Sequence, residues 1–192
     1  MNLALTPSMC PFPASSVSES GEHAKEGGSI DVGRQDFDHE SWLDRFFASY
    51  YRHRPVNATF IGVRGHDHAL PDFSENAVGD LEADAQSLLN QARDVQEPTD
   101  PAAALDLRLA KGLLELQRWE YGSNHFHRGN PSLHTGEAVF GVMAPFLARS
   151  LEPADRLSAA IERMQRVPDF LSTARACVGS APEEWNRRAA RE

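Results

Sequence analysis

Apolar residues recur three and four positions apart through most of the chain after residue 36, and this spacing restricts the chain to helices. No stretch of useful length alternates apolar and polar residues as a strand would, and no internal repeat is visible. We therefore predict an all-α fold, a multi-helix array of about six helices within residues 37–192. At 192 residues the chain can hold one domain with a hydrophobic core, and a second is not expected.

Capping residues and prolines predict where the helices begin and end. The first helix begins near Phe37, with Asp36 or Asp38 as its cap, and Pro55 either ends it or opens a short helix through Thr59. Ser74 is the expected cap of a helix over residues 74–96, and Asp100 followed by Pro101 predicts the start of a helix over 101–121. We expect further helices over residues 136–149, 153–178 (interrupted at Pro168) and from 183 onward, separated by loops that include 62–71 and 122–135.

Each predicted helix carries an apolar seam, which is typical of helices that pack side by side. The first three seams are Trp42, Leu43, Phe46, Phe47, Tyr50 and Tyr51; then Val78, Leu81, Ala85, Leu88, Ala92 and Val95; then Leu105, Leu109, Leu113, Leu116 and Trp119. The helix over 136–149 is apolar on most sides, which predicts that it is buried. Its residues Val139, Phe140, Val142, Met143, Phe146 and Leu147, together with Trp185, are the side chains that we expect to lack a packing partner within the chain.

Residues 1–36 are rich in Ser, Gly, Pro and Glu, have no apolar periodicity and are expected to be a disordered tail. Residues 1–15 carry no basic residue before their short apolar stretch, unlike a secretory signal, and no apolar run approaches the length of a membrane span. A cytoplasmic location is therefore expected. Two distant cysteines, Cys10 and Cys177, do not make a disulfide framework, and Cys177 is predicted to be a core residue rather than a nucleophile.

The net charge of −9 argues against a nucleic-acid partner, because proteins that bind phosphate backbones cluster Lys and Arg. The imbalance is sharpest over residues 72–100, where eight acidic residues face only Arg93. These acids show no calcium-loop spacing, so we interpret them as a solvated helix face.

Two His-x-His pairs, His66-Asp67-His68 and His125-x-His127, are the candidate metal ligands. Zinc needs three or four ligands that converge on one point, and the spacing supplies no third ligand for either pair. His39-Glu40 begins a His-Glu-x-x-His string, but Leu43 occupies the second histidine's position. The sequence holds no nucleophile elbow, phosphate loop or dinucleotide fingerprint, so no catalytic, cofactor-binding or metal-binding residue is assigned.

Residues 46–74 read FFASYYRHRPVNATFIGVRGHDHALPDFS. This run resembles the opening of the bacterial domain-of-unknown-function 885 family: an aromatic helix, a proline, a short Ala-Thr helix ending in glycine, and a loop that closes in Leu-Pro-Asp and Ser. Later pieces agree in order and spacing: Trp119, Asn130-Pro131, Arg156-Leu157, Ile161-Glu162-Arg163, Val167-Pro168, Phe170-Leu171, Ala174, Pro182 and Trp185. His66-Asp67-His68 departs from the family's Tyr-Asp-Asp style of segment.

The resemblance implies a helical, metallopeptidase-like protein. Members of that family are longer, and their zinc ligands lie in a later half that matches no position here, so zinc is expected only in the full-length family. We therefore expect residues 37–192 to be the helical N-terminal portion of a larger domain, truncated and not catalytic alone, whose partner is a missing C-terminal half or a second copy. The alternative is a stand-alone, non-catalytic helical protein-interaction module.

Overall fold

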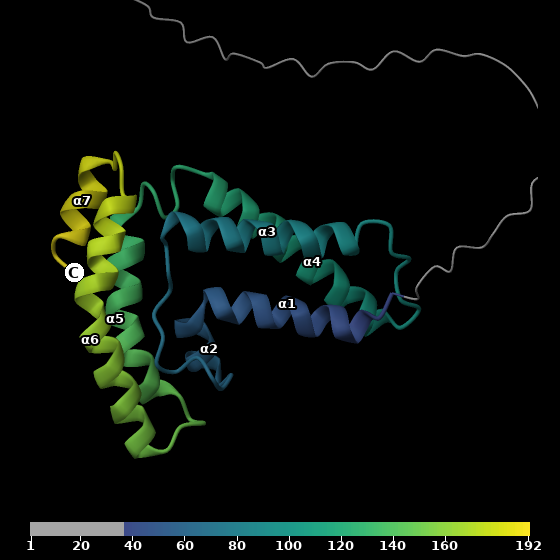
Figure 1. The fold of residues 1–192 in the computed structure, drawn as a ribbon, viewed down its shortest axis with the longest axis horizontal. Helices are drawn as coiled ribbons and strands as arrows, with labels where there is room; N and C mark the ends of the chain where they lie inside the picture. The colour runs from purple at the N-terminus through teal and green to yellow at the C-terminus, as the bar shows by residue number, and fades with distance from the viewer. Residues whose placement is uncertain (1–36) are drawn as a thin grey trace, which may run out of the picture. The chain divides into compact units, whose positions relative to one another are not determined.

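A computed structural model describes residues 37–192 of the chain (Figure 1). This part holds seven helices and no strand, which confirms the predicted all-α fold. The helices are α1 (His39–His53), α2 (Pro55–Ile61), α3 (Glu75–Gln91), α4 (Pro101–Gly122), α5 (Pro131–Leu147), α6 (Pro153–Cys177) and α7 (Glu183–Ala189). The prediction of a disordered tail over residues 1–36 lies outside the described residues.

Three helix starts follow the predicted capping chemistry. The carboxylate of Asp38 accepts a hydrogen bond from the Ser41 backbone N–H at 3.1 Å, and the Ser74 hydroxyl accepts one from Ala77 at 3.4 Å. Asp100 caps α4 in the same way, with Pro101 in the first turn, where its missing N–H costs nothing. Pro55 opens α2 rather than only ending α1.

Three predicted boundaries are wrong. Helix α5 begins at Pro131 rather than at Gly136, because a proline at the first helical position starts a helix as readily as it marks a loop. Helix α6 continues through Pro168, which is exposed, so water can replace the hydrogen bond that proline cannot donate. Helix α3 ends at Gln91, and the backbone carbonyl of the buried Ala92 just beyond it accepts a hydrogen bond from the ammonium of Lys111 at 3.0 Å.

Helices α1, α3 and α4 pack against one another and run across the view in Figure 1. Their shared core contains Trp42, Phe46, Ala85, Leu88, Ala92, Leu107, Ala110 and Leu114. The indole of Trp42 is fully buried, and its Nε1 donates to the Leu88 carbonyl oxygen at 3.1 Å, so α1 is held to α3 by both packing and a hydrogen bond. The acidic residues of α3 lie outside this core and are exposed, apart from Asp84, which accepts a hydrogen bond from Ser49 at 2.9 Å.

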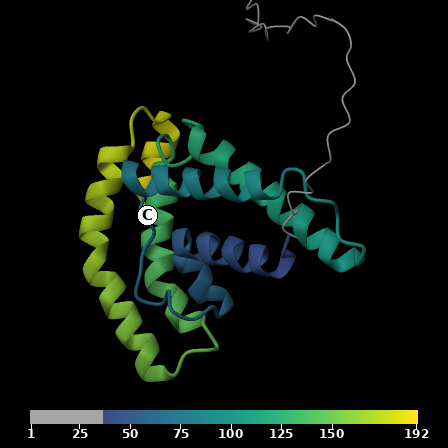
Figure 2. The ribbon, with the colours of Figure 1, turned by 45° about the vertical axis from the view of Figure 1, so that its right-hand side comes forward.

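Helices α5, α6 and α7 lie side by side in both views (Figures 1 and 2), and α2 packs against α5. A second core joins this group to α3 and α4 and contains Phe73, Val78, Leu81, Tyr121, Ala138 and Phe170. Within the described residues, no helix has both the length and the apolar composition that crossing a membrane would require.

The expectation of one apolar seam per helix is wrong for α4. The leucines at 105, 109, 113 and 116 and Trp119 are all exposed, whereas the buried face of α4 consists of Ala104, Leu107, Ala110, Leu114, Gln117 and Tyr121. On this buried face Leu107, Ala110 and Leu114 pack in one core with Ala85, Leu88 and Ala92, so large and small side chains fill the contact together. Helix α4 therefore has two apolar faces, and the described fold uses only one.

The prediction that α5 is buried holds for one side only. His134, Ala138, Gly141, Ala144 and Pro145 are buried, whereas Val139, Phe140, Met143, Phe146 and Leu147 are exposed. Trp185, which was expected to be left without packing, is half-buried. The contacts between α5 and α7 explain this difference, because α7 is held along α5 rather than projecting away from it.

Candidate functional site

The two histidines of the first His-x-His pair have separate surroundings. The backbone carbonyl of His66 accepts a hydrogen bond from Arg163 at 3.0 Å. The imidazole Nδ1 of His68 lies 3.1 Å from a carboxylate oxygen of Glu162 on α6, in an exposed pair. In residues 37–192, no three or more His, Cys, Asp or Glu side chains come together as a metal-binding group.

The second His-x-His pair splits between solvent and core. His125 is exposed, whereas His127 is buried and stacks on Phe73 with ring centres 6.3 Å apart. The ring of Tyr121 lies 5.3 Å away on another side of His127. His134, on α5, is equally buried, and its Nε2 lies 2.7 Å from the carbonyl oxygen of His127. Sequence spacing does not single out His134, because its partner is a backbone atom that only the folded turn brings close.

Arg163 is the most connected buried polar residue of the described fold, and it is fully buried. Its Nη1 donates to the Gly141 carbonyl oxygen at 2.8 Å. Its Nη2 donates to the Thr59 hydroxyl at 2.8 Å and to the carbonyl oxygens of His66 and Pro55 at 3.0 and 3.3 Å. One guanidinium thus joins α6 to α5, to α2 and to the loop that follows α2, and it uses four acceptors without a carboxylate among them.

Two acidic side chains near Arg163 influence its pKa through their charge. Burial lowers the pKa of Arg163 to about 10, while the negative charges of Asp67 and Glu137 oppose this decrease. The guanidinium therefore stays charged at neutral pH. Burial also raises the pKa of Glu137, although the charges of Arg54 and Arg163 work against that shift. This arrangement suits a structural cation that holds four segments together.

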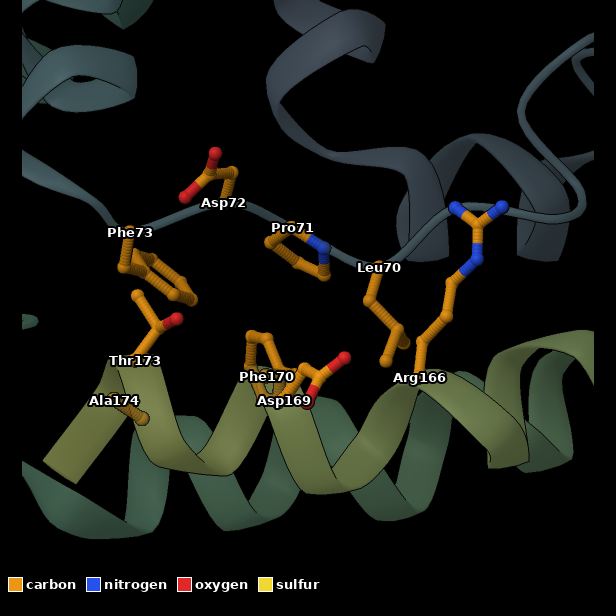
Figure 3. A pocket seen from close by; sticks show the side chains of 9 residues that line it. All are labelled: Leu70, Pro71, Asp72, Phe73, Arg166, Asp169, Phe170, Thr173 and Ala174. Carbon is orange, nitrogen blue, oxygen red and sulfur yellow. The ribbon is translucent and has the colours of Figure 1, made fainter.

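A groove of about 260 Å³ lies between the segment Leu70–Phe73 and α6. Figure 3 shows that Leu70, Phe73 and Phe170 form its apolar part, with Arg166 and Asp169 on the α6 side. The groove is smaller than the pockets of about 300–1,000 Å³ that usually bind small ligands. Its polar side chains are two carboxylates, a guanidinium and the hydroxyl of Thr173, a mixture that does not match one charged substrate class.

Cys177 lies near the end of this groove on α6. Its Sγ donates to the carbonyl oxygen of Phe73 at 3.0 Å, and the side chain is half-buried. Burial and the negative charges of Glu75 and Asp72 raise the pKa of the thiol, so it is protonated at neutral pH. This supports the prediction that Cys177 packs rather than reacts.

Two apolar surfaces of the described fold are exposed. The first, which we call the α5 face, comprises Phe60, Ile61, Val139, Phe140, Met143, Phe146 and Leu147. The rings of Phe60 and Phe140 lie 5.4 Å apart, which shows that α2 and α5 contribute to one surface. The second is the outer side of α4, where Trp119 is 68% exposed and Leu109 is 57% exposed. Surfaces of this kind on folded proteins mark sites of interaction more often than sites of chemistry.

Comparison of the chain with models of protein families, with curated proteins and with solved structures finds no match.

Proposed function

We propose that residues 37–192 are the non-catalytic helical part of a metallopeptidase-like protein and act by packing the α5 face against helices that carry the catalytic groups. The observation that carries this proposal is the α5 face itself, because seven large apolar side chains there remain exposed, with Phe146 at 53%. Covering a large side chain of this kind contributes about 1.5–3 kcal/mol when burial is complete. A surface formed by two helices therefore provides substantial driving force for docking.

The positions of the candidate ligands support the non-catalytic part of the proposal. His68 lies beside Glu162, His127 is enclosed by aromatic rings, and the ring of His66 lies 6.3 Å from the ring of Tyr51. These groups are engaged in separate contacts and do not surround a common point at which a substrate carbonyl and an activated water could meet. What residues 37–192 supply instead is a rigid helical surface.

To test the proposal, the purified 192-residue chain is mixed with the C-terminal part of a full-length member of the family that it resembles. We expect binding by calorimetry and an increase in melting temperature, since anything that binds only the folded state stabilises it. Met143→Glu and Phe146→Glu, which place charges in the α5 face, should each weaken binding about tenfold or more. Leu109→Glu, an equally exposed site on α4, is the matched control and should bind as the wild type does. An absence of binding, or binding that Met143→Glu and Phe146→Glu leave unchanged, would refute the proposal.

The alternative, a stand-alone helical interaction module, draws support from α4. Helix α4 has a second, exposed apolar face opposite its buried face, and such a face can pack against another helix. If this role is the correct one, the chain melts cooperatively by itself and gains no stability from the C-terminal part of a relative.

A further inference from the structure

The outer side of α4 carries an apolar seam with coiled-coil spacing. Its members are Leu105, Leu109, Gly112, Leu116 and Trp119, which we call the α4 seam. They are separated by four, three, four and three residues, the alternation of the a and d positions in a heptad. All five are exposed. At 1.5 Å of rise per residue the seam is about 21 Å long. Its natural occupant is therefore another helix of at least that length.

Gly112 lies at the centre of the seam. A methyl group added there would meet no atom of residues 37–192 within 4 Å, so the fold itself does not require glycine at this position. Glycine inside a helix lowers helix stability relative to alanine. A glycine that the chain's own packing does not explain, in the middle of an exposed apolar seam, favours close approach by another backbone.

We infer that α4 pairs with α4 of a second copy of this chain, antiparallel, about a two-fold axis at Gly112. Reversal about this residue brings Leu105 directly opposite the partner's Trp119, and Leu109 within one residue of the partner's Leu116. Each large side chain then packs on a leucine, and the two glycines meet where the helices are closest. A two-fold interface of this kind closes on itself and produces a dimer rather than a filament.

Charged residues beside the seam favour the antiparallel direction. Arg108 and Glu115 are exposed on the same flank, and the two-fold axis places Arg108 of each copy beside the partner's Glu115. Among residues 37–192, the ion-pair partner of Arg108 is Glu97, in a loose, exposed contact at 3.9 Å. The other flank brings Asp106 near the partner's Glu120, whose charge is already opposed by Arg54 at 3.7 Å.

A parallel pairing of the same seam is less favourable. It places Glu115 beside the partner's Glu120 and gives Arg108 a leucine, Leu113, as its neighbour across the interface. The parallel arrangement therefore loses both attractive contacts, whereas each arrangement brings one acidic residue of each copy near the partner's Glu120. The antiparallel arrangement also sets the two helix dipoles in opposition, which is the favourable orientation. This inference uses a surface different from the α5 face and does not depend on the proposed function.

Sedimentation velocity on the complete 192-residue chain tests the pairing. The wild type should dimerise at micromolar concentrations, and Leu109→Glu should be monomeric while keeping a wild-type far-UV circular dichroism spectrum. R108E and E115R should each weaken dimerisation about tenfold or more, because each converts both attractive contacts into repulsive ones. Mixing equal amounts of the R108E and E115R chains should restore dimers, since the mixed pair again has opposite charges at both contacts. Only an antiparallel α4 pair predicts that recovery.

Gly112→Ala distinguishes an effect on dimerisation from an effect on the stability of the folded chain. It should raise the melting temperature of the monomeric Leu109→Glu chain, because alanine favours helix, and weaken dimerisation of the otherwise unchanged chain. Met143→Glu on the α5 face is the matched control and should leave the dimer intact. A wild type that is monomeric at all micromolar concentrations would overturn the inference. So would a dimer lost with Met143→Glu and kept with Leu109→Glu, or R108E and E115R chains that do not recombine.

Discussion

The imidazole of His134 donates a hydrogen bond from Nε2 to the backbone carbonyl oxygen of His127, 2.7 Å away. Both histidines are only 2% exposed, and the ring of Phe73 lies 4.8 Å from His134 and 6.3 Å from His127. The Nδ1 atoms of both imidazoles are buried and have no hydrogen-bond partner among the described residues. Burial therefore lowers the pKa of both histidines, that of His127 to about 4, and both are neutral in the folded protein at pH 7.

Stability should fall as the pH decreases from about 6.5 to about 4. The pKa of His127 is 6.5 in the unfolded chain and about 4 in the folded chain. Between these two values the unfolded chain binds a proton at His127 and the folded chain does not, so acid favours unfolding. The stabilisation is complete above pH 6.5 and is lost as pH falls, by roughly 3–4 kcal/mol for a shift of this size. Urea unfolding measured across pH 7 to 5 should show the decline.

His127→Phe and His125→Phe form a matched pair for this measurement. The first removes the titrating group from the core and should flatten the dependence of unfolding free energy on pH. The second replaces an exposed imidazole two residues away and should leave the wild-type slope. Equal slopes in His127→Phe and the wild type would show that other groups cause the decline.

Arg163 should be among the most costly residues to replace. Arg163→Met leaves the Thr59 hydroxyl and the three carbonyl oxygens, including that of Gly141, without their donor, which should cost about 3 kcal/mol or more of unfolding free energy. Arg163→Lys keeps the charge but cannot span four acceptors, and it should cost about 2 kcal/mol. Both values come from urea midpoints at an unchanged slope.

Arg166→Met is the control on the same helix. Arg166 is exposed and lies one turn further along α6, so its replacement should change stability by about 0.5 kcal/mol or less. Similar costs at both arginines would contradict the structural role of Arg163.

Much of the fold could be predicted from local chemistry, because caps act within one turn. The caps at Asp38, Ser74 and Asp100 depend only on neighbouring residues, and each is where the sequence predicts it. The start at Pro131 was not found, because proline after asparagine is compatible with a loop and with a first helical turn. Only the packing of the rest of α5 decides between them.

The buried side of α4 could not be predicted, because the sequence offers two apolar faces. Leucines and a tryptophan have more surface to bury than alanines, so Leu109 and Trp119 are the better candidates by composition. The structure instead buries Leu107, Ala110 and Leu114, whose mixture of large and small side chains packs with Ala85, Leu88 and Ala92. The contacts of His134 and Arg163 could not be predicted for another reason: the partner of His134 and most partners of Arg163 are backbone carbonyl oxygens, which a residue pattern does not single out.

The purified chain should hold no stoichiometric zinc and should not hydrolyse peptides in a chelator-sensitive way. His68 pairs with Glu162 and His127 lies among aromatic rings, so the candidate ligands do not converge. Elemental analysis after dialysis checks the first expectation, and a peptide library with and without chelator checks the second. A zinc content of about one per chain that disappears in the His66→Ala, His68→Ala double variant would identify that pair as a true ligand pair.

Gly129→Ala should destabilise the protein, whereas Gly122→Ala should not. A methyl group on Gly129 would overlap the backbone carbonyl oxygen of Asn124 and come within 3.5 Å of the His125 Cα, so the turn over residues 124–130 must shift. Crowding of this kind costs about 1–3 kcal/mol. At Gly122, the last residue of α4, an added methyl group meets nothing within 4 Å in the described part of the chain. Alanine there should be neutral or stabilise by up to about 1 kcal/mol through helix propensity.

The same turn holds His127 in the core, so Gly129→Ala has a second, independent readout. Phe126 accepts hydrogen bonds at its carbonyl oxygen from the backbone N–H groups of Gly129 and Asn130, at 3.2 and 2.9 Å. A shifted turn loosens the burial that lowers the pKa of His127, so its imidazole should titrate closer to 6.5 than to 4 by NMR. In Gly122→Ala the titration should remain at the wild-type value. A Gly129→Ala protein with wild-type stability and an unchanged His127 titration would show that the turn accommodates a side chain, and that the close contact at Asn124 does not fix the position of His127.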